Sequence, residues 1–436
     1  MVSAVTATPW GDSGDLSARR LRPGPSASRE EVEANQRERI FGAMVAAVAE
    51  HGYEATRVAD VLEISGVSRN TFYKHFDNKL DCFLATMDAI ILCGSANVIA
   101  TYTTHEGPWD ARLTDGFKAL TTTLAAQPAA ARLFYVESAA AGPEAVAKVN
   151  EFGDRIFDIS RRSLEEAPDY AEMPHGLLLA VLRGMRRVMQ TRLRRGREAE
   201  LTQIAPELMS WALCYRTPPE PLHRPRKPPE QEFAVTPRDL EDPGERIMSA
   251  VIELMAEKGY RALTITDIAQ RAAVSLTTFY RLFKGKDDVA IAALRRSTEQ
   301  IVEAVGPAFR APDDWAQAVG DGLRAFFGFL VLERPYARFG GVDVHSGSPL
   351  ILDVREQLMT SAEDFIVSDT RDHPVVTPLV GEAIGASVDA LVFDQITKHG
   401  ERRLYEKAPI ATYLVLVPFV GVEQACAIAT DDPAKR

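Results

Sequence analysis

The side chains best suited to chemistry in this sequence are hydrogen-bonding and cationic groups on a short segment near residue 70. Arg69, Asn70, Tyr73 and Lys74 lie on it within six residues. An arginine presents two parallel donors that match the edge of a guanine, and an asparagine matches the edge of an adenine. Residues three and four apart lie together on an α-helix, so these groups share one face. The pattern indicates a helix that reads bases in duplex DNA.

A second segment of the same type lies 207 residues further along the chain and carries Leu276, Tyr280 and Arg281. The likeness is wider than the segment: residues 39–82 align without a gap on 246–289, and 17 of these 44 positions are identical. A repeat of this length is a domain duplication, because solenoid repeats are several-fold shorter. We therefore expect two reading heads in one polypeptide, with different side chains facing DNA.

Each segment needs a small helical frame to position it, and the sequence predicts a helix-turn-helix. In the first head the expected order is helix 36–50, a capping Gly52, helix 58–64, a turn at Gly66, Ser68 as N-cap and recognition helix 69–76. In the second head the order is a helix to 257, Gly259, a helix from Thr264, a turn at 272–273, Ser275 as N-cap and recognition helix 276–283. Phe72 and Phe76 are four residues apart, so we expect them to pack inward.

Both heads carry the pattern GVS-xx-TFY-xx-F-xx-K, with AVS in place of GVS in the second. This pattern resembles the TetR family of transcriptional regulators over about 45 residues per unit. The resemblance implies an all-α fold of two TetR-like units. In each unit a small DNA-binding head precedes a larger helical core, which binds a small ligand and dimerises through its last two helices. Ligand binding is then expected to release the DNA, as in a repressor.

The resemblance also assigns roles to individual residues. Its DNA-binding positions are Arg57, Ser68, Arg69, Asn70, Thr71, Tyr73, Lys74, His75 and Lys79 in the first head, and Thr264, Ser275, Leu276, Thr277, Thr278, Tyr280, Arg281 and Lys286 in the second. Among these, Tyr73, Tyr280, Lys79, Lys286 and Thr264 match phosphate-contact positions. Three residues depart from the family pattern: Arg57 replaces a threonine, Ala273 replaces a glycine, and Leu276 offers no hydrogen bond and is limited to a thymine methyl.

Composition shifts along the chain predict its domains. They are a disordered arm at 1–35, a first head at 36–82, a first helical core at 83–216, a linker at 217–243, a second head at 244–289 and a second core at 290–430. The linker contains eight prolines. It therefore favours an extended conformation that spans up to about 80 Å.

Several classes of protein are disfavoured. The net charge is −11, and the four cysteines lie far apart, as in a reducing cytoplasm and unlike a zinc site. No signal peptide is visible, and the apolar run 410–422 is shorter than a membrane span and is predicted to be a buried helix. The eight histidines are scattered and no phosphate loop occurs, so we expect neither an enzyme nor a cofactor.

The last helices of each unit predict how the units pair. They are expected at 175–195 and 199–215, and at 377–399 and 402–424. The first pair begins with Arg183, Arg186 and Arg187, whereas the second begins with Glu382, Asp389 and Asp394. Unlike units would set basic groups against acidic ones, which selects partners. We therefore expect the two units of one chain to pair on an asymmetric operator.

Other arrangements stay open at this point. Chains could instead dimerise and bridge two operators, pairing could be followed by further association of whole chains, or one head could have lost DNA binding in a ligand-binding or scaffolding protein. The expected partners are double-stranded DNA and a small, largely apolar effector, with no membrane. The effector, the operator and the sign of regulation are not readable from the sequence.

Overall fold

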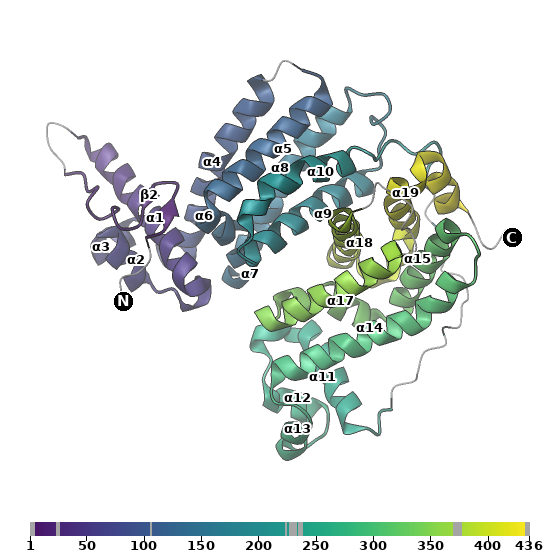
Figure 1. The fold of residues 1–436 in the computed structure, drawn as a ribbon. Coiled ribbons are helices and arrows are strands. Elements are labelled where there is room, and N and C mark those ends of the chain that lie inside the picture. The colour runs from purple at the N-terminus through teal and green to yellow at the C-terminus, as the bar shows by residue number, and fades with distance from the viewer. Residues whose placement is uncertain are drawn as a thin grey trace. The chain divides into compact units, whose positions relative to one another are not determined.

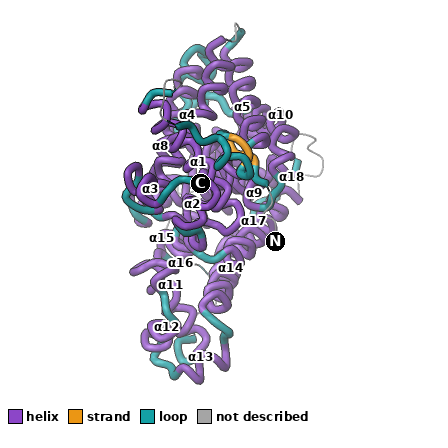
Figure 2. The backbone as a smooth tube through the Cα atoms, turned by 90° about the vertical axis from the view of Figure 1, so that its left-hand side faces the viewer, coloured by secondary structure: helices purple, strands orange, loops and turns teal. Residues whose placement is uncertain are grey.

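We analysed a computed structural model, which describes residues 5–22, 27–104, 107–222, 225, 233, 239–368 and 377–431. These residues are helical apart from turns and one small hairpin of β1 (Ala7–Thr8) and β2 (Gly11–Asp12), as Figure 2 shows. The all-α prediction is confirmed. The chain divides into two compact units. One comprises Met1–Ala171 and Arg186–Ser210, and the other Glu172–Met185 and Trp211–Arg436.

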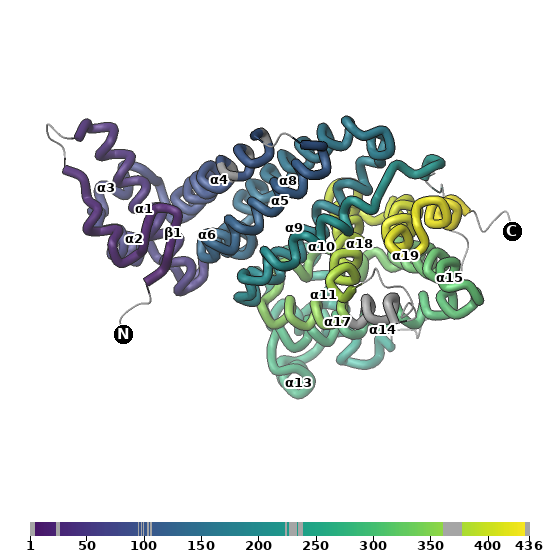
Figure 3. The backbone as a smooth tube through the Cα atoms, turned by 45° about the horizontal axis from the view of Figure 1, so that its top comes forward, coloured from purple at the N-terminus to yellow at the C-terminus, as the bar shows by residue number. Residues whose placement is uncertain are grey.

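The first unit begins with the predicted three-helix head, in which α2 and α3 lie beside α1 (Figure 1). Longer helices follow, of which α4, α5 and α8 run side by side (Figure 3). The elements are α1 (Arg29–Ala55), α2 (Val58–Ser65), α3 (Arg69–His75), α4 (Lys79–Thr104), α5 (Trp109–Ala126), α6 (Pro128–Arg132), the π-helical η1 (Leu133–Glu137), α7 (Ser138–Ala141), α8 (Pro143–Leu164), α9 (His175–Arg194), η2 (Glu198–Glu200) and α10 (Leu201–Ala212). The boundary between the two units falls within α9.

Helix α1 starts earlier than expected, and the reason is a capping box. The Glu31 amide donates to Ser28 Oγ at 3.1 Å, and the Ser28 amide donates to the Glu31 carboxylate at 2.7 Å. The helix is kinked at Gly52, where φ is +73°. The Tyr53 amide beyond the kink donates to the Glu137 carboxylate at 2.8 Å, which ties the first head to η1 of its own core.

The N-terminal segment differs from the expected disordered arm over residues 5–22. Leu16 is fully buried in the core of the first head, and Trp10 packs on Phe41 with 5.4 Å between ring centroids. Leu16 can approach α1 closely because residue 42 is a glycine: a Cβ at Gly42 would lie only 2.8 Å from a Leu16 methyl. The hairpin therefore extends the head, and Arg19 is bonded to the Trp10 carbonyl. The sequence did not reveal this packing, because a few apolar residues that pack against a distant part of the chain show no helical or strand periodicity.

The second unit repeats the head and adds a larger helical core. Its elements are the beginning of α9, α11 (Pro243–Ala262), α12 (Ile265–Arg271), α13 (Leu276–Leu282), α14 (Lys286–Arg310), α15 (Trp315–Leu332), α16 (Arg334–Gly341), η3 (Asp343–Ser346), α17 (Pro349–Ser368), α18 (Pro378–His399), η4 (Glu401–Lys407) and α19 (Ala408–Thr430). Phe279, Phe327, Phe339 and Tyr413 are completely buried in it. Most of the predicted linker lies outside the described residues, but residues 217–222 are described.

Helix α19 is the most apolar element of the described chain. By length and composition the segment Glu401–Thr430 would pass as a membrane span, which is weak evidence, since the buried core helix of a soluble protein passes the same test. Leu414, Val415 and Leu416 are completely buried, so this apolar surface serves the core of the second unit. Pro418 lies inside the helix, and Gly421 kinks it with a φ of +79°.

Candidate nucleic-acid interface

The two recognition helices are built by the same local chemistry. The Thr71 amide donates to Ser68 Oγ at 3.1 Å, and the Thr278 amide donates to Ser275 Oγ at 3.0 Å. Ser68 and Ser275 therefore act as N-caps. Each helix ends one residue before the predicted end, because Phe76 and Phe283 take extended backbone conformations that close the helix.

The phenylalanines divide each recognition helix into a buried and an exposed face. Phe72 and Phe279 are completely buried, whereas Tyr73 and Tyr280 keep 49% and 58% of their surface exposed. The exposed face of α3 carries the predicted Arg69, Asn70, Tyr73 and Lys74, and that of α13 carries Leu276, Thr277, Tyr280 and Arg281. The structure thus brings the expected base-reading side chains together on one surface of each head.

Some predicted residues of the first head already have partners. Lys74 Nζ lies 2.6 Å from the Glu33 carboxylate, in a pair exposed enough to exchange for phosphate at little cost. His75 lies 3.0 Å from the Gln36 side-chain oxygen and is half-buried. Burial, helped by the charges of Arg37 and Lys74, lowers the pKa of His75. Its neutral imidazole is therefore better placed to hold α3 against α1 than to attract phosphate.

Lys79 was expected to contact phosphate, but in the structure its ammonium lies against the C-terminal end of α1. Its ammonium donates to the carbonyls of Tyr53 and Thr56 at 2.8 and 2.9 Å, at the end of α1. The same ammonium lies 4.2 Å from the centre of the Tyr53 ring. Burial lowers the pKa of Lys79. A cation that satisfies the last carbonyls of a helix stabilises that end.

Lys286 repeats this contact in the second head. Its ammonium donates to the Tyr260 carbonyl at 3.2 Å and lies 4.3 Å from the centre of the Tyr260 ring. These lysines connect the start of the fourth helix of a unit to the end of its first, so the lysine shared by both copies of the motif stabilises the structure of each head.

Two arginines that the sequence analysis did not select also donate to carbonyls at the end of a helix. Arg39 is 3% exposed and donates to the Ser65 carbonyl, and Arg246 donates to the Ala272 carbonyl at 3.0 Å. Each caps the C-terminal end of the second helix of its head. The sequence does show that both heads carry an arginine at this aligned position. An arginine in a DNA-binding head is, however, more readily interpreted as a phosphate contact.

The departures from the family pattern have local consequences. Thr264 forms a capping box with Asp267, whereas Arg57 supplies only its backbone, whose amide donates to the Asp60 carboxylate at 2.7 Å. The Arg57 side chain is therefore available for phosphate. Ala273 stands where Gly66 stands in the first head, and both have left-handed backbone, with φ of +52° and +64°. Such a conformation strains an alanine but suits a glycine.

The second recognition helix is the more apolar of the two. Leu276 and Leu282 are 47% and 42% exposed, on either side of the exposed Tyr280. Arg271, the nearest cation on α12, is held by Glu253 and Glu257 at 3.0 and 2.7 Å. This head therefore offers fewer hydrogen-bond donors to base edges than the first.

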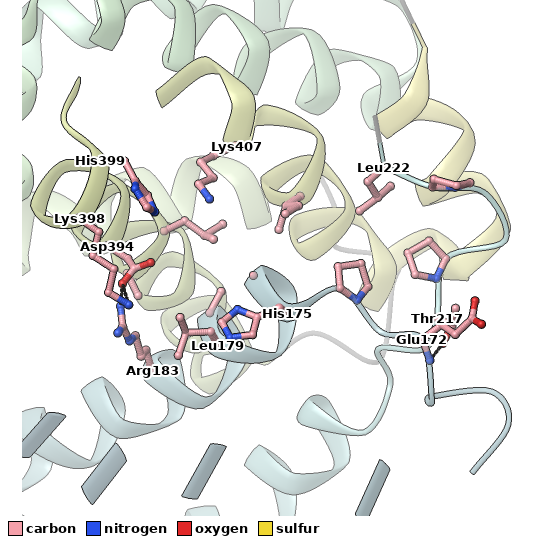
Figure 4. A pocket seen from close by; sticks show the side chains of 18 of the residues that line it. Glu172, His175, Leu179, Arg183, Thr217, Leu222, Asp394, Lys398, His399 and Lys407 are labelled. Atoms are coloured by element: carbon pink, nitrogen blue, oxygen red, sulfur yellow. Dashed lines mark hydrogen bonds and ion pairs between the residues drawn. The ribbon is translucent and has the colours of Figure 1, made fainter. Parts of the chain in front are cut away.

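The predicted pairing surface is described within the second unit, where the beginning of α9 packs on α18. Arg183 Nη1 lies 2.5 Å from the Asp394 carboxylate (Figure 4). Asp389 does not take part, because it pairs with Arg355 and lies 3.7 Å from His345. A Cβ on Gly184 would lie 2.0 Å from Ser387 Oγ, so only glycine permits this approach.

The segment after α10 also packs on α19 within this unit. The buried Tyr215 hydroxyl donates to the Leu414 carbonyl at 2.9 Å, and the Tyr413 hydroxyl donates to the Arg216 carbonyl at 2.9 Å. Cys426 Sγ reaches the Glu220 carbonyl at 3.5 Å. Within this unit, two reciprocal tyrosine hydrogen bonds thus join the segment after α10 to α19.

Comparison with known proteins gives consistent matches. The family model described as "Bacterial regulatory proteins, tetR family" matches residues 40–86 and 247–293. The HTH-type transcriptional activator FasR of Mycolicibacterium smegmatis is 34% identical over 172 residues, which are 39% of this chain and 67% of that protein. The fatty acid metabolism regulator protein of Bacillus subtilis is 34% identical over 58 residues, 13% of this chain and 30% of the relative. The structure of FadR from Bacillus subtilis in complex with stearoyl-CoA covers 40% of this chain and 96% of its own, with 18% identity and a TM-score of 0.36.

Proposed function

The chain belongs to the TetR family of bacterial DNA-binding transcriptional regulators, and from this premise we propose that one chain does the work of a family dimer. The two TetR-like repeats pair within the chain, and each head binds one half-site of a single operator. The observation that carries this proposal is the reciprocal tyrosine contact between the end of the first repeat and α19 of the second. The Arg183–Asp394 ion pair and the close approach at Gly184 support it.

The proposed DNA contacts follow from the exposed faces of α3 and α13. Arg69 and Asn70 read a guanine and an adenine in the major groove, while Tyr73, Tyr280 and Arg57 contact phosphates. Leu276 packs on a thymine methyl. Lys79 and Lys286 support the heads from within, so they are removed from the phosphate set. Because the two heads present different groups, the operator is asymmetric.

Footprinting of genomic DNA with the purified chain tests the operator, and affinity is expected to fall steeply as salt rises. Arg69→Ala should relax one position of one half-site at a cost of roughly 1–3 kcal/mol. Arg155→Ala on α8 is the matched control, because it removes an exposed arginine outside the heads. Equal binding of genomic and random DNA, or a perfect inverted repeat under the footprint, would contradict the proposal.

Light scattering coupled to size exclusion tests the pairing. We expect the DNA-binding species to have the mass of one chain, 47.9 kDa. Gly184→Leu should open the contact between α9 and α18 and weaken operator binding, because its side chain has no space beside Ser387. A stable species of twice the chain mass at low micromolar concentration, with no active monomer, would show that whole chains dimerise instead.

The exposed leucines of α13 favour one second candidate, in which the second head no longer reads DNA and the protein acts as a ligand-binding or scaffolding protein. Tyr73→Ala and Tyr280→Ala separate the two functions. A pseudo-dimer loses affinity with either change, whereas a chain with one working head loses affinity only with Tyr73→Ala. In both cases we propose that the helical cores bind a largely apolar effector and that the protein works in the cytoplasm.

A further inference from the structure

We propose that residues 5–22 are a second DNA-contacting element of the first head, in which Arg20 and Arg22 bind backbone phosphates beside the half-site that α3 reads. The segment carries the hairpin of β1 and β2 and lies on the head (Figure 1). The inference rests on the proposed function, because it presumes that α3 binds an operator. It goes beyond that function because neither arginine belongs to the helix-turn-helix motif.

Two neighbouring residues hold this segment against the turn that leads into α3. Leu16 is completely buried in the core of the first head. Ser17 packs on Gly66, at which an added Cβ would lie 2.8 Å from the Cβ of Ser17. Gly66 lies two residues before Ser68, the N-cap of α3. The segment therefore reaches the N-terminal end of the recognition helix.

Hydrogen bonds to α1 fix the backbone that carries the arginines. The Leu21 amide donates to the Asn35 side-chain oxygen at 3.2 Å, and the Asn35 side-chain amide donates to the Arg19 carbonyl at 3.1 Å. The side chains of Arg20 and Arg22 are exposed, and neither forms an ion pair with another residue of the described ranges. Two cations on a fixed backbone are thus presented to solvent next to the recognition helix.

The surroundings of Arg20 favour an anionic partner. Burial, and after it the charge of Arg20, lowers the pKa of Arg39, so these two guanidinium groups lie close enough to repel each other. Arg39 is bonded to the Ser65 carbonyl, which is neutral and does not offset this repulsion. A phosphate bound at Arg20 would offset it, because opposite charges at short distance stabilise each other.

The carboxylates in this part of the head do not neutralise the two arginines. Asp12 and Asp15 are exposed and pair with neither of them, and residues 5–22 contain three arginines against two aspartates, a net charge of +1. On the first turns of α1, Glu31 closes the capping box and Glu33 is held by two cations. Glu30 is exposed. The segment therefore keeps a small positive charge beside α3.

The second head has a different segment at the corresponding place. Arg246, which aligns with Arg39, donates to the carbonyls of Leu240 and Glu241 at 3.1 and 2.8 Å. Residues 239–242 contain three acidic residues and no basic one, a net charge of −3. A phosphate is repelled there and attracted by the arginines of the first head. We therefore assign the additional contacts to the first head alone.

The size of the major groove explains why the partners are phosphates. A helix with its side chains is about 10–12 Å across and fills a groove that is about 12 Å wide. Groups beside the N-terminal end of the recognition helix therefore face the phosphates that border the groove. A guanidinium offers two parallel donors that match phosphate oxygens. Arg20 and Arg22 have the position and the chemistry for such contacts.

Operator binding by the double variant Arg20→Gln/Arg22→Gln across a salt series tests this inference. Each lost phosphate contact lowers the magnitude of the slope of log K against log salt by about 0.9, so we expect a decrease of about two. Affinity should fall alike on all operator sequences, because phosphate contacts carry no base information. Hydroxyl-radical footprinting should show lost protection beside the first half-site only, and Arg69→Ala identifies that half-site.

Arg155→Gln/Arg402→Gln is the matched control, because it removes the same charge from exposed positions outside both heads. It should leave the slope and the footprint unchanged. A slope for the Arg20→Gln/Arg22→Gln variant equal to that of the control would overturn the inference, as would an unchanged footprint. The unaltered chain separates the two failures. Lack of preference for any genomic fragment contradicts the proposed function, whereas an operator bound with the same slope by chain and variant contradicts only the role of residues 5–22.

Discussion

The hydroxyl of Tyr215 replaces a backbone donor that Pro418 cannot supply. In an α-helix the Leu414 carbonyl would accept from the amide of residue 418, but proline has no N–H. Leu414 is completely buried, so water cannot satisfy its carbonyl. The Tyr215 hydroxyl donates to it at 2.9 Å from the end of the first repeat. Burial raises the pKa of Tyr215, which keeps the hydroxyl protonated and donating.

Tyr215→Phe removes this donor and little else. The ring stays, and with it the edge contact to Trp211 at 5.5 Å between centroids. A buried acceptor left without a partner costs about 1–3 kcal/mol. We therefore expect the second unit to lose about 2 kcal/mol of unfolding free energy. Tyr413→Phe is the matched control: its hydroxyl serves the Arg216 carbonyl outside a helix, so the expected cost is about 0.5–1.5 kcal/mol.

A double-mutant cycle isolates the mechanism. Pro418→Ala restores an amide at position 418 that can bond the Leu414 carbonyl, so Tyr215→Phe should cost less than about 1 kcal/mol in that background. The direct effect of removing the proline ring cancels from the cycle. Native-state hydrogen exchange of peptides from α19 gives the opening free energy of this unit without assuming that the whole chain unfolds in one step. An equal cost of Tyr215→Phe with Pro418 and with Ala at that position would refute the reasoning.

Three further predictions concern single residues. Lys79→Met should destabilise the first head by about 1–3 kcal/mol by hydrogen exchange, because carbonyls at the end of α1 lose their donor; weaker DNA binding with unchanged exchange would restore a phosphate role. Ala273→Gly should stabilise the second head by roughly 1 kcal/mol in thermal melts by relieving left-handed strain. Gly66→Ala should destabilise the first by more, since its Cβ would also lie 2.8 Å from that of Ser17; the reverse order would contradict this. Burial raises the pKa of Asp343 to about 6, so the folded state keeps a proton that the unfolded chain loses. Stability should therefore fall by about 2 kcal/mol as pH rises from 4 to 6 and stay level above, and Asp343→Asn should flatten the profile in urea titrations.

The two heads were predictable from the sequence because their structure is written in local signals. Ser68 and Ser275 precede their helices and cap them, and Phe72 and Phe279 recur at the spacing that buries one face. A glycine occupies the turn of the first head. Such interactions join residues a few positions apart, so a linear pattern contains both partners. The repetition of the pattern made coincidence implausible, and the exposed face proposed to read bases lies opposite the buried phenylalanines.

The roles of the repeated lysines required the tertiary structure. Lys79 meets its carbonyls 23 and 26 residues upstream, after the chain has turned twice. Sequence shows the charge of such a residue but not which surface the charge faces. The sequence cannot distinguish a lysine that contacts phosphate from one that bonds the end of a helix. Only the packing of α4 against α1 shows which role Lys79 has.

The contacts between the repeats depend on the longest paths in the chain. Tyr215 and Leu414 are 199 residues apart, and neither lies in a motif. The sequence showed a proline inside an apolar run and opposite charges on the last helices, which predicted that unlike helices would meet. It could not show which tyrosine would satisfy the orphaned carbonyl, because a hydrogen bond depends on a few tenths of an ångström that only the packed helices define.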